Sequence, residues 1–176
     1  MKRITLLLIA VTTVAGAVSF TATASRPVHQ EAAPVFVTKV PDGYRDWKLV
    51  SVAHEEGNLK DIRAILGNEI AIKAYRDGKL PFPDGAIIGR IAWAHVSSEE
   101  NDKAFGQAQS FIAGAPTEFY LQFMVKDSKK YAATGGWGFA SFDQNLKPTD
   151  DAAMKKCFPC HQAVPTRDLV FTRYSP

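Results

Sequence analysis

Short runs of apolar and β-branched residues recur along the chain, and turns that contain glycine, asparagine or proline separate them. Runs of this length and composition favour strands, and an antiparallel sheet is their natural arrangement. We therefore predict five strands, over residues 47–52, 62–66, 86–94, 118–125 and 137–142.

Three segments between or after these runs have features of short helices. Residues 69–76 place apolar side chains at helical intervals, and Asp77 and Gly78 follow as a stop signal. Serine and aspartate residues that can cap a helix predict two more, although Gly106 weakens the first of them. These two helices are expected over residues 98–111 and 127–133.

The chain contains no internal repeat and no sign of a second domain. Residues 41–176 are therefore expected to form one α+β domain, a mainly antiparallel β-sheet with short helices packed on it. The preceding residues, 25–40, mix proline, alanine and polar residues without a helical or strand period, and we interpret them as a leader to this domain.

The first 24 residues have the pattern of an export signal. Lys2 and Arg3 precede an apolar stretch over residues 4–18, and the small residues 22–24 (ATA) form a cleavage site. The apolar stretch is shorter than the ~20 residues of a spanning helix, so a membrane anchor is the weaker alternative. The sequence predicts a signal peptide cleaved near Ala24 and a periplasmic protein that has no membrane association after cleavage.

Composition and charge exclude several classes of protein. Of 176 residues, 46% are apolar and 22% are charged, which fits one ordinary globular domain rather than a disordered chain. The net charge of +3 is spread along the chain without a basic block, which argues against a nucleic-acid partner. The 2 cysteines allow at most one disulfide, too few for a stapled mini-protein.

The two cysteines form the sharpest motif in the sequence, because residues 157–161 read CFPCH. Two thiols separated by two residues can each add across a vinyl group of one haem, and the adjacent histidine is then held under the iron. The motif predicts one haem c, attached covalently through Cys157 and Cys160, with His161 as the metal ligand.

Two other uses of a C-x-x-C spacing compete with this interpretation. A thioredoxin-like dithiol normally opens a helix in a βαβ unit, whereas this motif lies near the C-terminus of a mostly antiparallel pattern. A structural zinc site would need two more ligands, and these would have to be carboxylates or His29, His54 or His95.

The ligand on the other side of the iron decides the class of function. Met154 lies only three residues before Cys157, and Met124 lies in an apolar strand where a packing role is expected. His54 and His95 are expected at strand ends, as surface or loop residues. We therefore predict a five-coordinate iron with one open position.

Six stretches together resemble the cytochrome P460 family, in order along residues 41–176. They are residues 43–47 (GYRDW), 61–63 (DIR), 82–86 (FPDGA), 136–140 (GWGFA), 157–161 (CFPCH) and 169–173 (LVFTR). The resemblance implies a homodimer of sheet-rich subunits, one c-type haem in each, a proximal histidine and an open distal side. In members that oxidise hydroxylamine, it also implies a lysine cross-linked to the haem ring.

At the position of that lysine, counted along the strand from Asp84 and Gly85, the chain has Arg90. A guanidinium stays protonated and is a poor nucleophile, so the cross-link is not expected. The related cytochrome c′-beta proteins lack it and bind small gases such as nitric oxide. Arg90 either lies over the haem or points to water from an edge strand. The resemblance also places Arg63 in the distal pocket, and we take both arginines as candidate catalytic residues.

Three functions follow as hypotheses. The favoured one is an exported haem protein that binds nitric oxide or similar nitrogen-oxide ligands and carries out redox chemistry on them. The first alternative is an enzyme that oxidises hydroxylamine, and the second is a simple electron carrier. The sequence leaves open whether the protein is an enzyme. The expected partners are the small-molecule ligand, a second copy of the chain and a cytochrome redox partner.

Overall fold

The computed structural model describes residues 36–175, which all belong to one compact unit over Ala32–Pro176. The predicted signal peptide and residues 25–35 of the predicted leader lie outside the described residues. Among the helices of residues 36–175, none combines the length and the apolar character that a membrane crossing requires.

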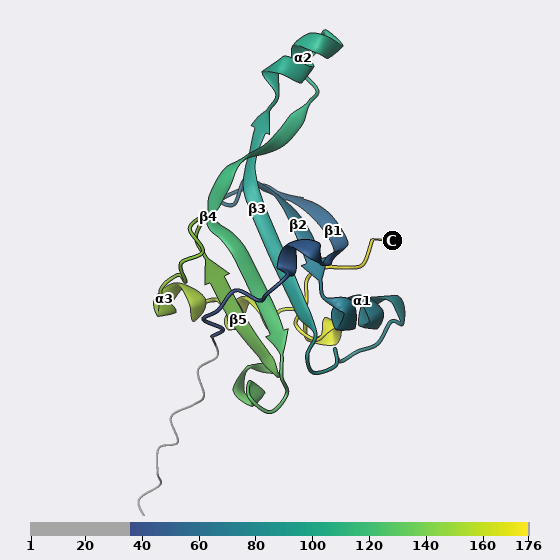
Figure 1. The fold of residues 1–176 in the computed structure, drawn as a ribbon, viewed down its shortest axis with the longest axis vertical. Helices are drawn as coiled ribbons and strands as arrows, with labels where there is room; N and C mark the ends of the chain where they lie inside the picture. Colours follow the sequence, from purple (N-terminus) through teal and green to yellow (C-terminus); the bar gives the residue numbers. More distant parts are fainter. Residues whose placement is uncertain (1–35, 176) are drawn as a thin grey trace, which may run out of the picture. The chain divides into compact units, whose positions relative to one another are not determined.

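The centre of this unit is an antiparallel sheet of five strands that lie in sequence order, each beside the next (Figure 1). The α+β fold predicted from the sequence is confirmed. β3 is the middle strand, with two strands on each side. The strands are β1 (Lys48–Glu55), β2 (Asp61–Gly67), β3 (Ile87–Ser97), β4 (Phe111–Lys126) and β5 (Trp137–Phe142).

β3 and β4 continue beyond the other strands as a long hairpin. The pairing of β2 with β3 ends at Ala94, whereas the pairing of β3 with β4 runs on to Ser97 and Phe111. The helix α2 (Glu99–Phe105) lies at the tip of this hairpin (Figure 1). The helix predicted over residues 98–111 is therefore wrong beyond residue 105. Gly106 ends α2 with a left-handed φ of 73°.

The other two helix predictions have different outcomes. The helix α1 (Glu69–Arg76) is confirmed, and the side chain of Asn68 caps it by accepting from the N–H of Ala71 at 3.0 Å. The helix predicted over residues 127–133 is wrong. The carboxylate of Asp127 accepts from the backbone N–H groups of residues 129 and 130, and these bonds close a turn. Only a 3₁₀ turn, η2 (Ala132–Thr134), follows it.

Each face of the sheet carries its own cluster of buried side chains. One face, called the α4 face below, is covered by α1 and by the C-terminal segment. This segment includes α3 (Asp151–Met154), α4 (Cys157–His161) and η3 (Pro165–Arg167). Its core includes Val50, Ile65, Ile88, Met124 and Phe139. The opposite face, called the η1 face below, is covered by η1 (Tyr44–Asp46), which lies in front of the sheet in Figure 1. Its core includes Ile91, Leu121, Phe123 and Phe142.

Candidate functional site

The helix α4 presents both cysteines of the C-x-x-C motif from a single turn. Side chains three residues apart lie on the same side of a helix, so the two thiols are neighbours. Both are free, and Cys157 is partly buried against the α4 face while Cys160 is exposed. Burial raises the pKa of the Cys157 thiol, and the nearby Cys160 raises it further. A reactive redox dithiol has a lowered thiol pKa, so this arrangement disfavours the thioredoxin-like alternative.

His161 ends α4, and its ring is held in one orientation. Its Nδ1 lies 2.7 Å from the backbone carbonyl of Leu169. A carbonyl can only accept, so Nδ1 carries the proton and Nε2 keeps its lone pair. The rings of Phe139 and Phe171 flank the imidazole, each with its centroid 5.2 Å away. Burial lowers the pKa of His161 and favours the neutral form, which is the form that ligates a metal.

Arg90 lies on the α4 face of the central strand, two residues beyond Ile88. Its side chain is only 14% exposed, so the alternative of an edge-strand arginine that points to water is wrong. It pairs with Asp61, and its Nη1 donates to the carbonyl of Phe119 at 2.9 Å and to Oε1 of Gln122 at 3.0 Å. Burial lowers the pKa of Arg90, and the Arg63 cation lowers it further, while the Asp61 carboxylate raises it.

Arg63 joins the same cluster through Asp61. The Nε of Arg63 donates to Oδ1 of Asp61 at 2.7 Å, and Glu55 lies 3.4 Å from its Nη1. Asp61 is 1% exposed and is the common partner of both arginines. Sequence reasoning did not identify Asp61 as a site residue. A signal was present, because residues two apart on a strand share a face, which places Asp61 beside Arg63.

These residues fit a haem. Two thiols, an imidazole with a free Nε2 and an apolar surface around Phe139 belong to one face of the sheet. Within residues 36–175, the buried Nε of Arg90 makes no hydrogen bond, whereas Nη2 of Arg63 lies 2.7 Å from Oδ1 of Asp61. Buried guanidinium nitrogens are normally bonded, so the Nε of Arg90 is available to an oxygen-bearing group such as a haem propionate or a small bound ligand.

The other predicted ligand candidates lie elsewhere or are enclosed. The rings of His54 and His95 lie against each other at a tilt of 37°, with their centroids 4.0 Å apart. His54 of β1 pairs with Ile62 of β2. Ile62 is next to Arg63 in the strand, so its side chain faces the opposite side of the sheet. Met124 and Met154 are both buried. His29 lies outside the described residues. Over residues 36–175, no three His, Cys, Asp or Glu side chains gather as a metal-binding group.

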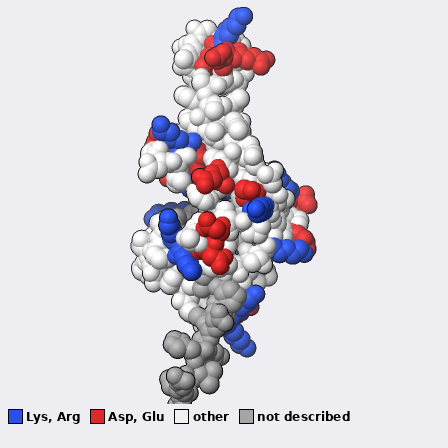
Figure 2. Space-filling model, turned by 90° about the vertical axis from the view of Figure 1, so that its left-hand side faces the viewer, with Lys and Arg blue, Asp and Glu red and all other residues white. Residues whose placement is uncertain are grey.

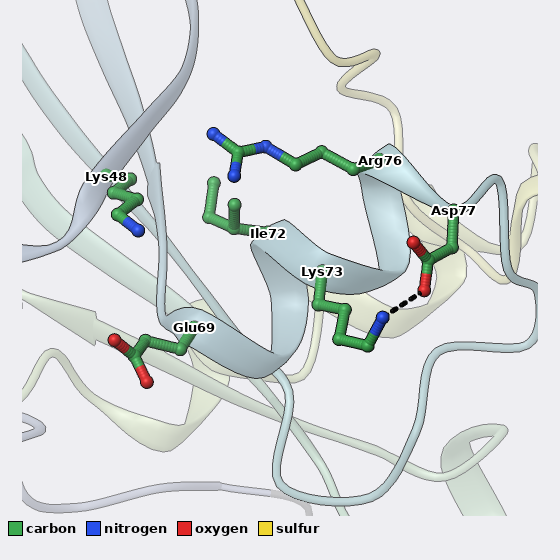
Figure 3. Close-up of a pocket in the computed structure, with 6 residues that line it drawn as sticks. All are labelled: Lys48, Glu69, Ile72, Lys73, Arg76 and Asp77. Atoms are coloured by element: carbon green, nitrogen blue, oxygen red, sulfur yellow. Dashed lines mark hydrogen bonds and ion pairs between the residues drawn. The ribbon is translucent and has the colours of Figure 1, made fainter.

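A surface hollow of about 320 Å³ lies along α1 (Figure 3), and none of the six residues that line it belongs to the C-x-x-C motif. It is lined by charged side chains, and Lys73 points to Asp77, with Nζ 2.7 Å from Oδ2. Lys73 and Lys79 precede the strand that contains Arg90, but Lys73 lies on α1 and Lys79 follows that helix. An exposed ion pair with Asp77 engages the amine of Lys73, whose side chain is 78% exposed.

Comparison with known proteins agrees with this site. No curated protein matches the chain. The family model described as Cytochrome P460 matches residues 41–172, which is most of the chain and includes the whole sheet, both arginines and the C-x-x-C-H motif. The chain therefore belongs to the cytochrome P460 family, and this membership implies a c-type haem as its cofactor.

Proposed function

We propose that this protein is an exported mono-haem cytochrome whose five-coordinate iron binds small nitrogen-oxide ligands such as nitric oxide. The observation that carries the proposal is the place of Arg90. It occupies the strand position expected for a cross-linking lysine, and it lies buried on the same face as the C-x-x-C-H helix, bonded to Asp61. This face thus presents a fixed cation and hydrogen-bond donors, but no free amine at that position.

In this proposal the residues of α4 attach and orient one haem. Cys157 and Cys160 each add across a vinyl group, so that sulfur bonds to one vinyl carbon and the thiol hydrogen goes to the other, with no oxidant needed. His161 supplies Nε2 to the iron, while Leu169 fixes its tautomer. When bound, the haem supplies an iron that can hold a small ligand and exchange an electron with it.

The two arginines supply hydrogen bonds on the same face. Asp61 neutralises part of their charge and holds both guanidinium groups in place. Both remain protonated, because a guanidinium keeps its proton in proteins. Within residues 36–175, the Nε of Arg90 makes no hydrogen bond, and it is the donor available to a bound oxygen atom.

An open iron position is supported by where the alternative ligands lie. Met124 packs in the core of the α4 face, and Met154 is equally enclosed. His54 and His95 are engaged with each other, and His95 also stacks on Phe111. These contacts disfavour the closed coordination of a simple electron carrier.

The alternative is an enzyme that oxidises hydroxylamine, and membership of the cytochrome P460 family favours it. That activity would need a lysine amine at the haem ring. Lys73 is paired with Asp77 on α1, and Lys126 is paired with Asp168 in the interior. Arg90 holds the expected position, so we rank ligand binding first.

We also propose that the protein acts in the periplasm as a homodimer that exchanges electrons with a cytochrome partner. The N-terminal sequence pattern supports export. For the dimer, the stem of the β3–β4 hairpin offers a surface. Figure 2 shows this stem free of charged side chains on the visible face, below the charged tip at α2. Phe111, Ile112 and Val96 are exposed there.

The test is expression in a periplasm that contains haem-maturation machinery. The band should stay coloured after denaturing electrophoresis, and replacing both Cys157 and Cys160 with alanine should remove the colour. The ferric protein should be high-spin, and the ferrous protein should bind nitric oxide without a red-shifted Soret band. A red-shifted ferrous Soret band with rapid hydroxylamine oxidation would favour the enzyme instead. A low-spin spectrum with methionine ligation would favour the electron carrier.

A further inference from the structure

The backbone around Leu169, whose carbonyl accepts the hydrogen bond from His161, has an unusual conformation. Asp168 and Leu169 both have left-handed backbone angles, with φ of 50° and 67°. Non-glycine residues rarely adopt this region, and surrounding contacts must hold them in it. The carbonyl of Leu169, which receives Nδ1–H of His161, follows directly from this turn.

A buried lysine holds the side chain of Asp168. The Nζ of Lys126 lies 2.8 Å from both carboxylate oxygens, and the two side chains are 5% and 11% exposed. The N–H of Phe82 donates to the same carboxylate at 2.8 Å. The indole Nε1 of Trp137 donates to the Asp168 carbonyl, also at 2.8 Å. Asp168 is therefore fixed at both its side chain and its backbone.

The turn before β5 fits closely around this ion pair. Gly135 accepts from Nζ of Lys126 at 3.1 Å. A Cβ on Gly135 would lie 2.9 Å from Leu169, and one on Gly136 would lie 3.3 Å from Nζ of Lys126. Both glycines have positive φ, so this turn favours residues without a side chain. The contacts form a continuous path from the turn, through Lys126 and Asp168, to the carbonyl that orients His161.

We propose that Lys126 and Asp168 are positioning residues for the iron ligand His161. Their ion pair holds the 168–169 turn, so the Leu169 carbonyl stays aligned with Nδ1. A hydrogen bond at Nδ1 makes the imidazole a more basic ligand, and a misaligned carbonyl weakens that effect. The inference rests on the ligation of haem iron by His161 proposed above. A merely structural ion pair would change stability and leave the iron–histidine bond as it is.

The test is Lys126→Met in the holoprotein, which removes the charge and keeps a long, flexible side chain. Resonance Raman spectroscopy of the ferrous protein reads the iron–histidine stretch directly. We expect this band to move to lower frequency, and the reduction potential to rise, because a less basic imidazole stabilises ferric iron less. The matched control is Lys73→Met, which breaks another Lys–Asp pair on the exposed side of α1. Its band and potential should equal those of the native protein.

A second variant, Asp168→Asn, tests the same inference if Lys126→Met does not fold. Asp168→Asn removes the charge, keeps the shape, and retains an oxygen that can accept from Phe82. It should shift the same band in the same direction, by less. An unchanged band in Lys126→Met, or in Asp168→Asn where the first variant yields no holoprotein, overturns the inference. A native protein without covalent haem on a denaturing gel would instead overturn the proposed haem attachment, so the two failures are distinguishable.

Discussion

The two buried ionic clusters on the α4 side of the sheet differ in how completely their groups are bonded. In the Lys126–Asp168 cluster, Nζ meets both carboxylate oxygens and a carbonyl, and the carboxylate also accepts from a backbone N–H. In the other cluster, two guanidinium groups share one carboxylate, Asp61, and within residues 36–175 the Nε of Arg90 is left without a hydrogen bond. The first arrangement suits a structural support, and the second suits a group that keeps donors available for a ligand.

The largest effect is expected from removing the shared carboxylate. Asp61→Leu leaves the buried guanidinium of Arg90 without its carboxylate and leaves Arg63 with Glu55 alone, which should lower the free energy of unfolding by about 3–5 kcal/mol. Chemical denaturation measures it. The control Asp77→Leu breaks an exposed pair and should cost at most about 1 kcal/mol. Equal losses in the two variants would mean that Asp61 does not hold the arginines.

The support role of the Lys126–Asp168 cluster predicts strong coupling between its two members. Lys126→Met and Asp168→Leu should each be destabilising, because each leaves the other charge buried and unpaired. The double variant should lose less than the sum of the two, by about 0.5–3 kcal/mol, measured by denaturant unfolding of all four proteins. Additive losses would contradict a direct interaction between the two side chains.

Arg90→Lys tests whether the cluster around Asp61 faces the haem. Lysine keeps a charge near Asp61 but loses bonds to Phe119 and Gln122, so unfolding should become easier by about 1 kcal/mol. If the new amine reaches the ring, the ferrous Soret band should shift to the red. Arg45→Lys makes the same change on the η1 face and should leave the spectrum unchanged. A native spectrum and native nitric-oxide binding in Arg90→Lys would place Arg90 away from the haem.

The smallest effect is expected at Asp102, an exposed carboxylate that accepts from backbone N–H groups rather than from a buried cation. Backbone N–H groups of Gln109 and Ser110 donate to Asp102 and lower its pKa. A lowered pKa stabilises the folded state above the normal aspartate pKa, and this contribution is lost as the pH falls through the lowered value. Amide hydrogen exchange at residues 109 and 110 should therefore gain its full protection above that range. Asp102→Asn should remove the pH dependence, and an unchanged profile would contradict the assignment.

Much of the fold could be predicted from local signals. β5 and α1 match the predicted ranges because two glycines directly precede β5 and a capping asparagine directly precedes α1. The start of β4 was missed because Gly114 and Pro116 are poor strand residues, and this part pairs only with β3. The helix expected after β4 was wrong because the Asp127 side chain bonds the backbone N–H groups that a helix start leaves free.

The sequence by itself determined the C-x-x-C-H motif and the identity of its histidine, because those residues are neighbours and their spacing carries the chemistry. It left the direction of Arg90 open, since no local pattern tells whether a strand lies at the edge or in the middle of a sheet. The tertiary structure decided that β3 is central and that Arg90 is buried against Asp61. It also decided the pairing of Lys126 with Asp168, which are 42 residues apart. Such contacts depend on how the strands and the C-terminal segment pack, and therefore only the folded chain defines them.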